Sequence, residues 1–580
     1  MEKESLVNNI IRFFDLIVLL FIVFDFGYDF VDNFNSPHVV LLLVLSVLLL
    51  GFNIFKFFKY KIKSKKNVAR GNSIIIGIIL LLSTIYAIID RNESPEAVLQ
   101  NIKPILEGGL IFYFLLRLMT FVRHVYDVYY NPAIVFIGSF VIIDLAGAFL
   151  LMLPSATTHG ISFTNALFTS TSAVCVTGLA VLDTSKDFTL IGHTIIVSLI
   201  QLGGIGILTF TSFFSYFFRS SSSFREGLNT KDFIAHESLS DIFKAALNVV
   251  ILTLIIEFIG GLFIYSSVVG NPEIKNKVFF SLFHSVSAFC NAGFSTFSAG
   301  LYDTTIRFNY FLQWIIMLLI IFGGLGHNIM FNFVQYFKTN FKELINPKLV
   351  HKQVRIITLN TKIVIYSTIF LLIGGFVFLF LSEYTNTLQE HSTIFGKITA
   401  ASFNSVTPRT AGFNAVDFTQ MTVPSLLFII FLMWIGGSPA STAGGIKTST
   451  FALATLNIWA IARGKSRIQL FGRRISSESV ARAFAIVCIS LIIIGIGIIL
   501  LLIFEPKNTD LLTIVFECFS AYGTVGLSLN FTPTISEASK YVLIALMFLG
   551  RIGMLNLLYG MLQEINHQFY EYPKENITIN

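Results

Sequence analysis

The sequence predicts an all-α polytopic membrane protein from three observations: an apolar composition, a fourfold internal repeat, and apolar runs of two lengths in a fixed order. Of the 580 residues, 54% are hydrophobic and only 13% are charged. Soluble globular proteins have about a quarter charged residues, so the composition excludes that class. A helix that crosses a bilayer needs about 20 mostly apolar residues. Runs of that length recur from end to end.

Four short segments, which we call the glycine stretches, repeat along the chain. Each ends in a glycine followed by Leu or Phe, and the glycines lie 115, 119 and 114 residues apart. A period this long exceeds the roughly 20–50 residues of solenoid repeats, so it indicates duplication of a larger membrane unit. The stretches are Val174–Leu179, Phe289–Phe294, Pro408–Phe413 and Tyr522–Leu527.

We expect about twelve crossings. The predicted spans lie near 10–31, 38–57, 73–90, 105–122, 132–153, 190–217, 245–268, 308–337, 360–382, 421–460 (interrupted), 479–503 and 538–563. An apolar segment too short to cross precedes each glycine stretch, which is typical of a re-entrant loop that lines a water-filled path. These segments are Phe163–Ala173, Val278–Phe289, Ile394–Asn404 and Leu511–Tyr522.

The predicted organisation is four units, each with a first helix, a re-entrant loop and a second helix, in pseudo-fourfold arrangement around one pore. They occupy 131–218, 240–338, 358–460 and 475–570, and are called repeats 1 to 4 below. Residues 1–130 form an N-terminal extension with about four further helices. Because Asp15, Asp25 and Asp29 fall in its first helix, we interpret the N-terminus as retained and not as a cleaved signal peptide.

Lysine and arginine gather in the loops 56–70, 338–362 and 463–474. Basic short loops stay in the cytoplasm, so both termini are predicted to be cytoplasmic and the glycine stretches face outward. The outer loops carry acids. Asp183, Asp303 and Asp417 follow their glycines within ten residues, with Asn530 in the fourth repeat. These carboxylates either concentrate cations at an outer mouth or are ordinary solvated loop residues.

The glycine stretches have the chemistry of a cation filter. Rings of backbone carbonyls can replace the hydration shell of an ion, and glycine adopts the backbone angles that turn carbonyls toward one axis. The carboxyl ends of the half-length helices add negative potential there. The predicted ion-binding residues are Val176, Thr177, Gly178, Asn291, Ala292, Gly293, Thr410, Ala411, Gly412, Thr524, Val525 and Gly526, with the ion at their carbonyls.

A second glycine group, at Gly203, Gly323, Gly436 and Gly550, follows each stretch by 24 to 30 residues. Small residues there favour close helix packing. In the third repeat Pro439 and neighbouring small residues interrupt the second helix. This segment lacks the spacing of a nucleotide-binding loop. The predicted gate consists of Gly436, Gly437, Ser438, Pro439, Ser441, Gly444, Gly445, Lys447 and Arg551.

Arg551 lies near the middle of the membrane, where an unpaired arginine is costly. It is either a fixed charge that limits ion passage or a structural residue paired with a helix-end carbonyl, Glu257 or Glu517. Arg409 holds a position filled by Cys175, Cys290 and Gly523 in the other repeats, so we expect control of the pore in repeat 3. Two sets are interpreted as interior residues: the polar Gln201, His284, His327, Asn328 and Asn404, and the cysteines Cys175, Cys290, Cys488 and Cys518.

On the four glycines, the interrupted segment and Gly550-Arg551-Ile-Gly553, residues 131–570 resemble the Trk/Ktr/HKT superfamily of potassium transporters, and within it the bacterial Trk/Ktr membrane subunit. The resemblance implies a homodimer in the plasma or inner membrane, in contact with lipid and with a cytosolic ring of nucleotide-binding regulatory subunits. It also implies potassium as substrate, since all four filter positions are glycine. It implies no cofactor on this chain and no nucleic-acid partner. Ala440 departs from the glycine of many relatives.

Two other functions fit parts of the sequence. A sodium-conducting relative would share the fold and differ only in selectivity. A polytopic enzyme acting on lipid-linked substrates would need paired carboxylates or histidine clusters at the membrane surface, and no such cluster recurs.

Overall fold

The computed structural model describes residues 14, 17–25, 27, 35–59, 63–89, 94–95, 97–99, 101–103, 105–110, 113–114, 132–223, 239–345, 357–465 and 467–553. Apart from loops and two isolated bridges, these residues are helical except for one antiparallel hairpin, β1 (Gln469–Leu470) with β2 (Arg473–Arg474). The predicted all-α membrane fold is confirmed.

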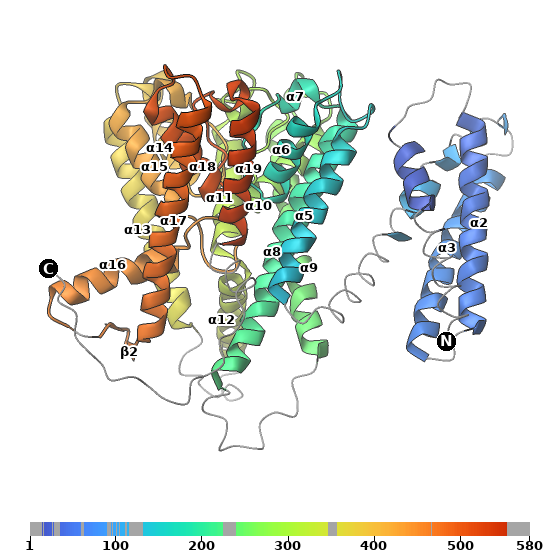
Figure 1. Ribbon diagram of the computed structural model, residues 1–580, viewed down its shortest axis with the longest axis horizontal. Helices are drawn as coiled ribbons and strands as arrows, with labels where there is room; N and C mark the ends of the chain where they lie inside the picture. Colours follow the sequence, from blue (N-terminus) through green and yellow to red (C-terminus); the bar gives the residue numbers. More distant parts are fainter. Residues whose placement is uncertain are drawn as a thin grey trace.

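The same order of helices occurs four times: a long first helix, a half-length helix and a second helix (Figure 1). In chain order these are α5 (Pro132–Leu151), α6 (Phe163–Val174), α8 (Leu190–Ser223); α9 (Leu239–Val268), α10 (Lys277–Cys290), α11 (Tyr310–Leu325); α13 (Leu359–Ser382), α14 (Ile394–Val406), α15 (Val423–Trp434); and α17 (Ser477–Phe504), α18 (Leu511–Gly523), α19 (Glu537–Ile552). The half-length helices all lie in the upper half of the body in Figure 1.

Local sequence explains where three half-length helices begin. Ser162, Asn276 and Thr393 each accept a hydrogen bond from the backbone N–H three residues on, at 3.3, 3.2 and 3.0 Å. Such N-caps satisfy one of the free amide groups at a helix start. Each half-length helix therefore starts at a fixed residue and points its carboxyl end toward the glycine stretch that follows.

The repeats pack in a closed cycle. The second helix of each repeat contacts the half-length helix of the next: α8 with α10, α11 with α14, α15 with α18, and α19 with α6. The last contact joins the end of the chain to repeat 1. Apolar clusters fill these contacts, for example Val174, Ile200 and Cys290 at the junction of repeats 1 and 2.

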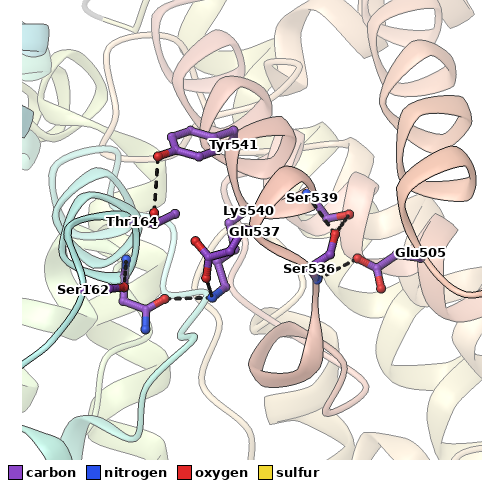
Figure 2. Close-up of polar contacts among 9 residues, drawn as sticks. Ser162, Thr164, Glu505, Ser536, Glu537, Ser539, Lys540 and Tyr541 are labelled. Carbon is purple, nitrogen blue, oxygen red and sulfur yellow. Dashed lines mark hydrogen bonds and ion pairs between the residues drawn. The ribbon is translucent and has the colours of Figure 1, made fainter.

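Polar contacts close the junction between repeats 4 and 1 at the outer end of α19 (Figure 2). Lys540 donates to the Oδ1 of Asn165 at 2.8 Å and pairs with Glu537 at 2.7 Å, while Tyr541 and Thr164 lie within 3.2 Å. The hydrogen bond from Lys540 lowers the pKa of the Glu537 carboxyl. These contacts join helices that are more than 370 residues apart in the chain.

Two second helices are not continuous. The predicted interruption of 421–460 is present, because a loop at 435–447 separates α15 from α16 (Thr448–Ala462). The single span predicted at 308–337 is wrong. α11 ends at Leu325, and α12 (His327–Ile345) departs at 98°. The break falls at Gly326, whose φ of +78° does not continue a helix.

Five described helices are long and apolar enough to cross a membrane alone, or six if α11 and α12 count as one span. They include α2 (Asn35–Lys59) and α3 (Lys63–Ile89) of the N-terminal extension, close to two predicted spans. The predicted spans at 10–31 and 105–122 lie partly outside the described residues, as do the part of 538–563 beyond residue 553 and most of the loop 224–238.

The extension has its own apolar core, which includes Val18, Leu42, Ile76 and Leu106. The buried Asp25 of its first helix lies 2.9 Å from His38 and 3.5 Å from Lys103. The acidic character of that helix is therefore balanced inside the bundle. The extension also meets the pore body, where the Ser155 amide donates to the carbonyl of Gly27 at 3.0 Å.

Candidate functional site

The four glycine stretches share one backbone conformation. In each stretch the glycine and the residue two before it both have positive φ: Val176 and Gly178 (55° and 92°), Asn291 and Gly293 (63° and 69°), Thr410 and Gly412 (75° and 76°), Thr524 and Gly526 (49° and 91°). Non-glycine residues seldom adopt this conformation, and a β-branched residue there is unusual. Such strain at equivalent positions of four repeats is a common sign of a functional site.

The four glycines also form a closed ring. A Cβ atom added to Gly178 would lie 2.3 Å from the carbonyl oxygen of Ala292 in the next repeat. The corresponding distances are 2.8 Å from Gly293 to Ala411, 2.2 Å from Gly412 to Val525, and 2.2 Å from Gly526 to Thr177. Each glycine thus lies against a carbonyl of the following stretch. The structure brings all twelve residues predicted for the ion site into this ring.

Hydroxyl groups at the ends of the half-length helices hold the stretches, and our sequence interpretation missed them. Ser172 and Ser520 accept from the amides of Gly178 and Gly526 at 3.0 and 3.1 Å. Ser287 and Thr407 instead donate to the carbonyls of Phe294 and Phe413, at 2.8 and 2.5 Å. The signal was available, because repeats 1, 2 and 4 each have serine six residues before the glycine.

The second glycine group lies directly against the half-length helices. A Cβ on Gly203, Gly323 or Gly550 would meet the carbonyl oxygen of Val174, Phe289 or Tyr522 at 1.9 Å in each case. The predicted close approach is therefore observed. In repeat 3 the equivalent Gly436 packs against Gly444 of its own loop, 2.2 Å from the carbonyl oxygen by the same measure.

The 435–447 loop lies beneath the ring and connects repeats 2 and 4. Ser438 donates through its amide to Gly324 O at 2.9 Å and through its hydroxyl to Leu325 O at 2.7 Å. On the other side, the amide of Gly445 donates to Gly550 O at 3.2 Å. Ala440 has φ of +59°, a conformation that costs a residue with a side chain about 1–2 kcal/mol.

Arg551 and Lys447 bind carbonyl groups of this loop. The Arg551 guanidinium donates to Thr442 O in the loop and to Gly203 O of α8 at 3.4 Å. The Lys447 ammonium donates to Ala443 O and Gly444 O. Of the alternatives for Arg551, the structure shows carbonyl partners. Glu257 contacts Gln201 at 2.8 Å instead, and Glu517 contacts Ser528 and Thr532.

Arg409 links the third glycine stretch to the start of the loop. Its side chain is 8% exposed and donates to Gly436 O at 3.2 Å. It also lines a cavity of about 20 Å³ with Gly437, Thr368 and Leu372, which is roomy enough for one water molecule. Repeat 3 therefore differs from the others in having a buried cation between its glycine stretch and its broken helix.

The remaining polar predictions have mixed outcomes. His284 is hydrogen-bonded in the interior to Phe280 O at 2.9 Å and to Ser295 at 3.0 Å, and Gln201 bonds to Glu257, as expected. Asn404 is buried, but its Oδ1 has no partner among the described residues. Cys175, Cys290 and Cys518 are buried free thiols, whereas Cys488 is exposed on α17, so the interior prediction is wrong for Cys488.

The outer carboxylates cap turns. Asp183, Asp303 and Asp417 each accept from the backbone N–H two residues further on, at 2.9, 3.1 and 3.0 Å. Asp183 also lies 3.4 Å from the exposed Lys186. These contacts give each carboxylate a structural role in an outer loop, which does not decide between the two interpretations of the acidic mouth.

Glu383 is a buried acid at the outer end of α13. One carboxylate oxygen accepts from the amide and hydroxyl of Thr422 at 3.0 and 2.8 Å, and the other accepts from Asn386 and Thr387 at 2.8 and 3.0 Å. Burial alone raises the pKa of this carboxyl. The hydrogen bonds from Ser425, Thr422 and Asn386 outweigh burial and lower the pKa below its ordinary value of 4.5.

Because its pKa is lower in the folded state, Glu383 stabilises the fold above pH 4.5, and this contribution is lost as pH falls through the folded pKa. We expect Glu383→Gln to unfold at lower temperature than wild type at pH 7, by about 2 kcal/mol, since an amide cannot accept all four bonds. Thermal unfolding in detergent should show this difference shrinking well below pH 4.5. Glu478→Gln, at an exposed ion pair with Arg482, is the control. An equal difference at both pH values would contradict the assignment.

A ring of backbone carbonyls at the carboxyl ends of four half-length helices, set within a membrane bundle, defines the class of ion-conducting membrane proteins. The chain belongs to the TrkH family, described as cation transport protein, which matches residues 105–568. It is 35% identical over 458 residues to the potassium/sodium uptake protein NtpJ of Enterococcus hirae, a match that covers 77% of this chain and 97% of that protein.

Other relatives agree with this assignment. The chain is 36% identical over 452 residues to the Ktr system potassium uptake protein B of Vibrio alginolyticus, covering 77% of this chain and 94% of that protein. Its fold is similar to the crystal structure of the potassium transporter TrkH from Vibrio parahaemolyticus, with a TM-score of 0.57, 17% identity, and coverage of 91% and 99% of the two chains. The protein is a membrane cation transporter and not an enzyme. Most of the N-terminal extension lies outside the family match.

Proposed function

We propose that the protein takes up potassium through a selectivity filter formed by the four glycine stretches. The ring of glycines against neighbouring carbonyls is the observation that carries this proposal. Twelve residues supply four sets of carbonyl groups around one axis, and such rings replace the hydration shell of a potassium ion. The potassium uptake named for several relatives supports the choice of ion.

The 435–447 loop, Lys447 and Arg551 form the gate in this proposal. They lie beneath the ring and hold one another through backbone carbonyls, so an arrangement that releases the loop would open the path. The transporter works in the cell membrane as a homodimer, with both termini in the cytoplasm. A cytosolic ring of nucleotide-binding subunits moves the loop. Support for this assembly comes from the family membership.

Sodium is the alternative substrate, because the Enterococcus relative is named for potassium and sodium uptake. The deciding experiment is uptake in a bacterial host that lacks its own potassium systems, with potassium, rubidium and sodium compared. We expect growth to be rescued at low potassium, and rubidium but not sodium to compete for uptake. Preferential sodium uptake by the intact protein would contradict the proposal.

A further inference from the structure

Two of the four half-length helices carry a buried polar residue at the same position behind the glycine stretch. His284 of α10 and Glu517 of α18 each lie nine residues before the glycine, Gly293 and Gly526. Both side chains are fully buried. Their equivalence is not visible from residue type, because one is an imidazole and the other a carboxylate.

Both residues contact the serine two positions beyond the glycine. The Nδ1 of His284 lies 2.9 Å from Phe280 O, and a carbonyl can only accept, so Nδ1 carries the hydrogen. In the neutral ring Nε2 then accepts from the Ser295 hydroxyl at 3.0 Å. Glu517 accepts from the Ser528 hydroxyl and, at 3.0 Å, from the Thr532 hydroxyl. Each contact ties the segment just outside the ring to its half-length helix.

Repeat 1 has no such tie. Its equivalent residue is Thr169, a buried side chain whose hydroxyl has no partner among the described residues, and Ala180 replaces the serine. In repeat 3 the corresponding residues are Phe403 and Asn414. The order of contacts around the ring runs through repeats 1, 2, 3 and 4. The two ties therefore lie in opposite repeats.

We propose that His284 and Glu517 are positioning residues for ion selectivity: each fixes the outer end of its glycine stretch through Ser295 or Ser528. This inference rests on the proposed function. A ring that prefers potassium must not close around the smaller sodium ion, at least where cavity size contributes to selectivity. A hydrogen bond from the rigid helix to the segment after the glycine opposes that inward movement. The His284 ring also lies 6.4 Å from that of Phe413, so its effect extends to the third stretch.

The test compares potassium and sodium uptake by wild type and by three variants, Ser528→Ala, Ser295→Ala and Glu517→Gln. We expect the ratio of potassium to sodium uptake to fall about threefold or more in each serine variant, and by less in Glu517→Gln, which keeps one acceptor oxygen. The double variant Glu517→Gln/Ser528→Ala should be no worse than Ser528→Ala, because both changes remove the same contact. Amounts of protein in the membrane and thermal stability are measured in parallel.

Thr169→Val is the matched control, since it alters the same position behind the first stretch without removing a hydrogen bond. Its uptake ratio should equal that of wild type. An unchanged ratio in both serine variants, or an equal fall in Thr169→Val, would overturn the inference. A wild-type protein without potassium preference would instead contradict the proposed function, so the two failures are distinguishable.

Discussion

Replacing Arg551 with alanine is expected to raise potassium flux about tenfold. In the closed arrangement the guanidinium donates to Thr442 O of the 435–447 loop and to Gly203 O of α8, and thereby joins the loop to two other repeats. A hydrogen bond from a charged group contributes about 1.5–3 kcal/mol, and 1.4 kcal/mol changes an equilibrium about tenfold. Alanine should therefore shift the loop toward open arrangements. Rubidium uptake into proteoliposomes measures the effect.

Two variants refine this result. Arg551→Lys keeps the positive charge but not the two-carbonyl geometry, so intermediate flux would indicate a latch, whereas wild-type flux would indicate an electrostatic barrier. Arg482→Ala removes an exposed arginine paired with Glu478 on the same chain and should have no effect. Deleting part of Ser438–Gly444 should also raise flux. If neither Arg551→Ala nor the deletion changed flux, the gate assignment would be wrong.

Replacing Gly412 with serine is expected to lower the preference for potassium over sodium about tenfold. The new Cβ would lie 2.2 Å from the carbonyl oxygen of Val525 in the next repeat, so that carbonyl must move. The φ of +76° adds about 1–2 kcal/mol of strain for any residue with a side chain. Competition between sodium and rubidium for uptake gives the preference.

The control for this variant is Gly374→Ser on α13, where an added Cβ meets no atom within 4 Å. It should keep wild-type preference. Gly178→Ser alters the opposite stretch, with a Cβ 2.3 Å from Ala292 O, and should behave like Gly412→Ser. Wild-type preference in both stretch variants would show that the ring does not select the ion.

The sequence was sufficient to predict the repeat architecture and the twelve residues of the ring. The repeated glycines have a physical cause that is visible in a single chain, since left-handed backbone and close approach both favour glycine. The interruption near Pro439 was predictable for the same kind of reason. The break at Gly326 was not, because the apolar run at 308–337 continues through it and only the positive φ ends the helix.

The partners of Arg551 were also beyond prediction. They are backbone carbonyls 109 and 348 residues away, and a carbonyl acceptor has no signature in the residue type. Sequence reasoning therefore searched for acids and named Glu257 and Glu517, both of which have other partners. The serine ties behind the second and fourth stretches escaped notice because His284 and Glu517 differ chemically. Their common role depends on packing between distant segments.

The most direct test of the central claim is the position of the bound ion. Crystals of the protein grown with rubidium in place of potassium should show anomalous scattering density on the axis of the ring formed by Gly178, Gly293, Gly412 and Gly526, within coordination distance of the carbonyls of Thr177, Ala292, Ala411 and Val525. Density elsewhere in the bundle, with none inside this ring, would contradict the account.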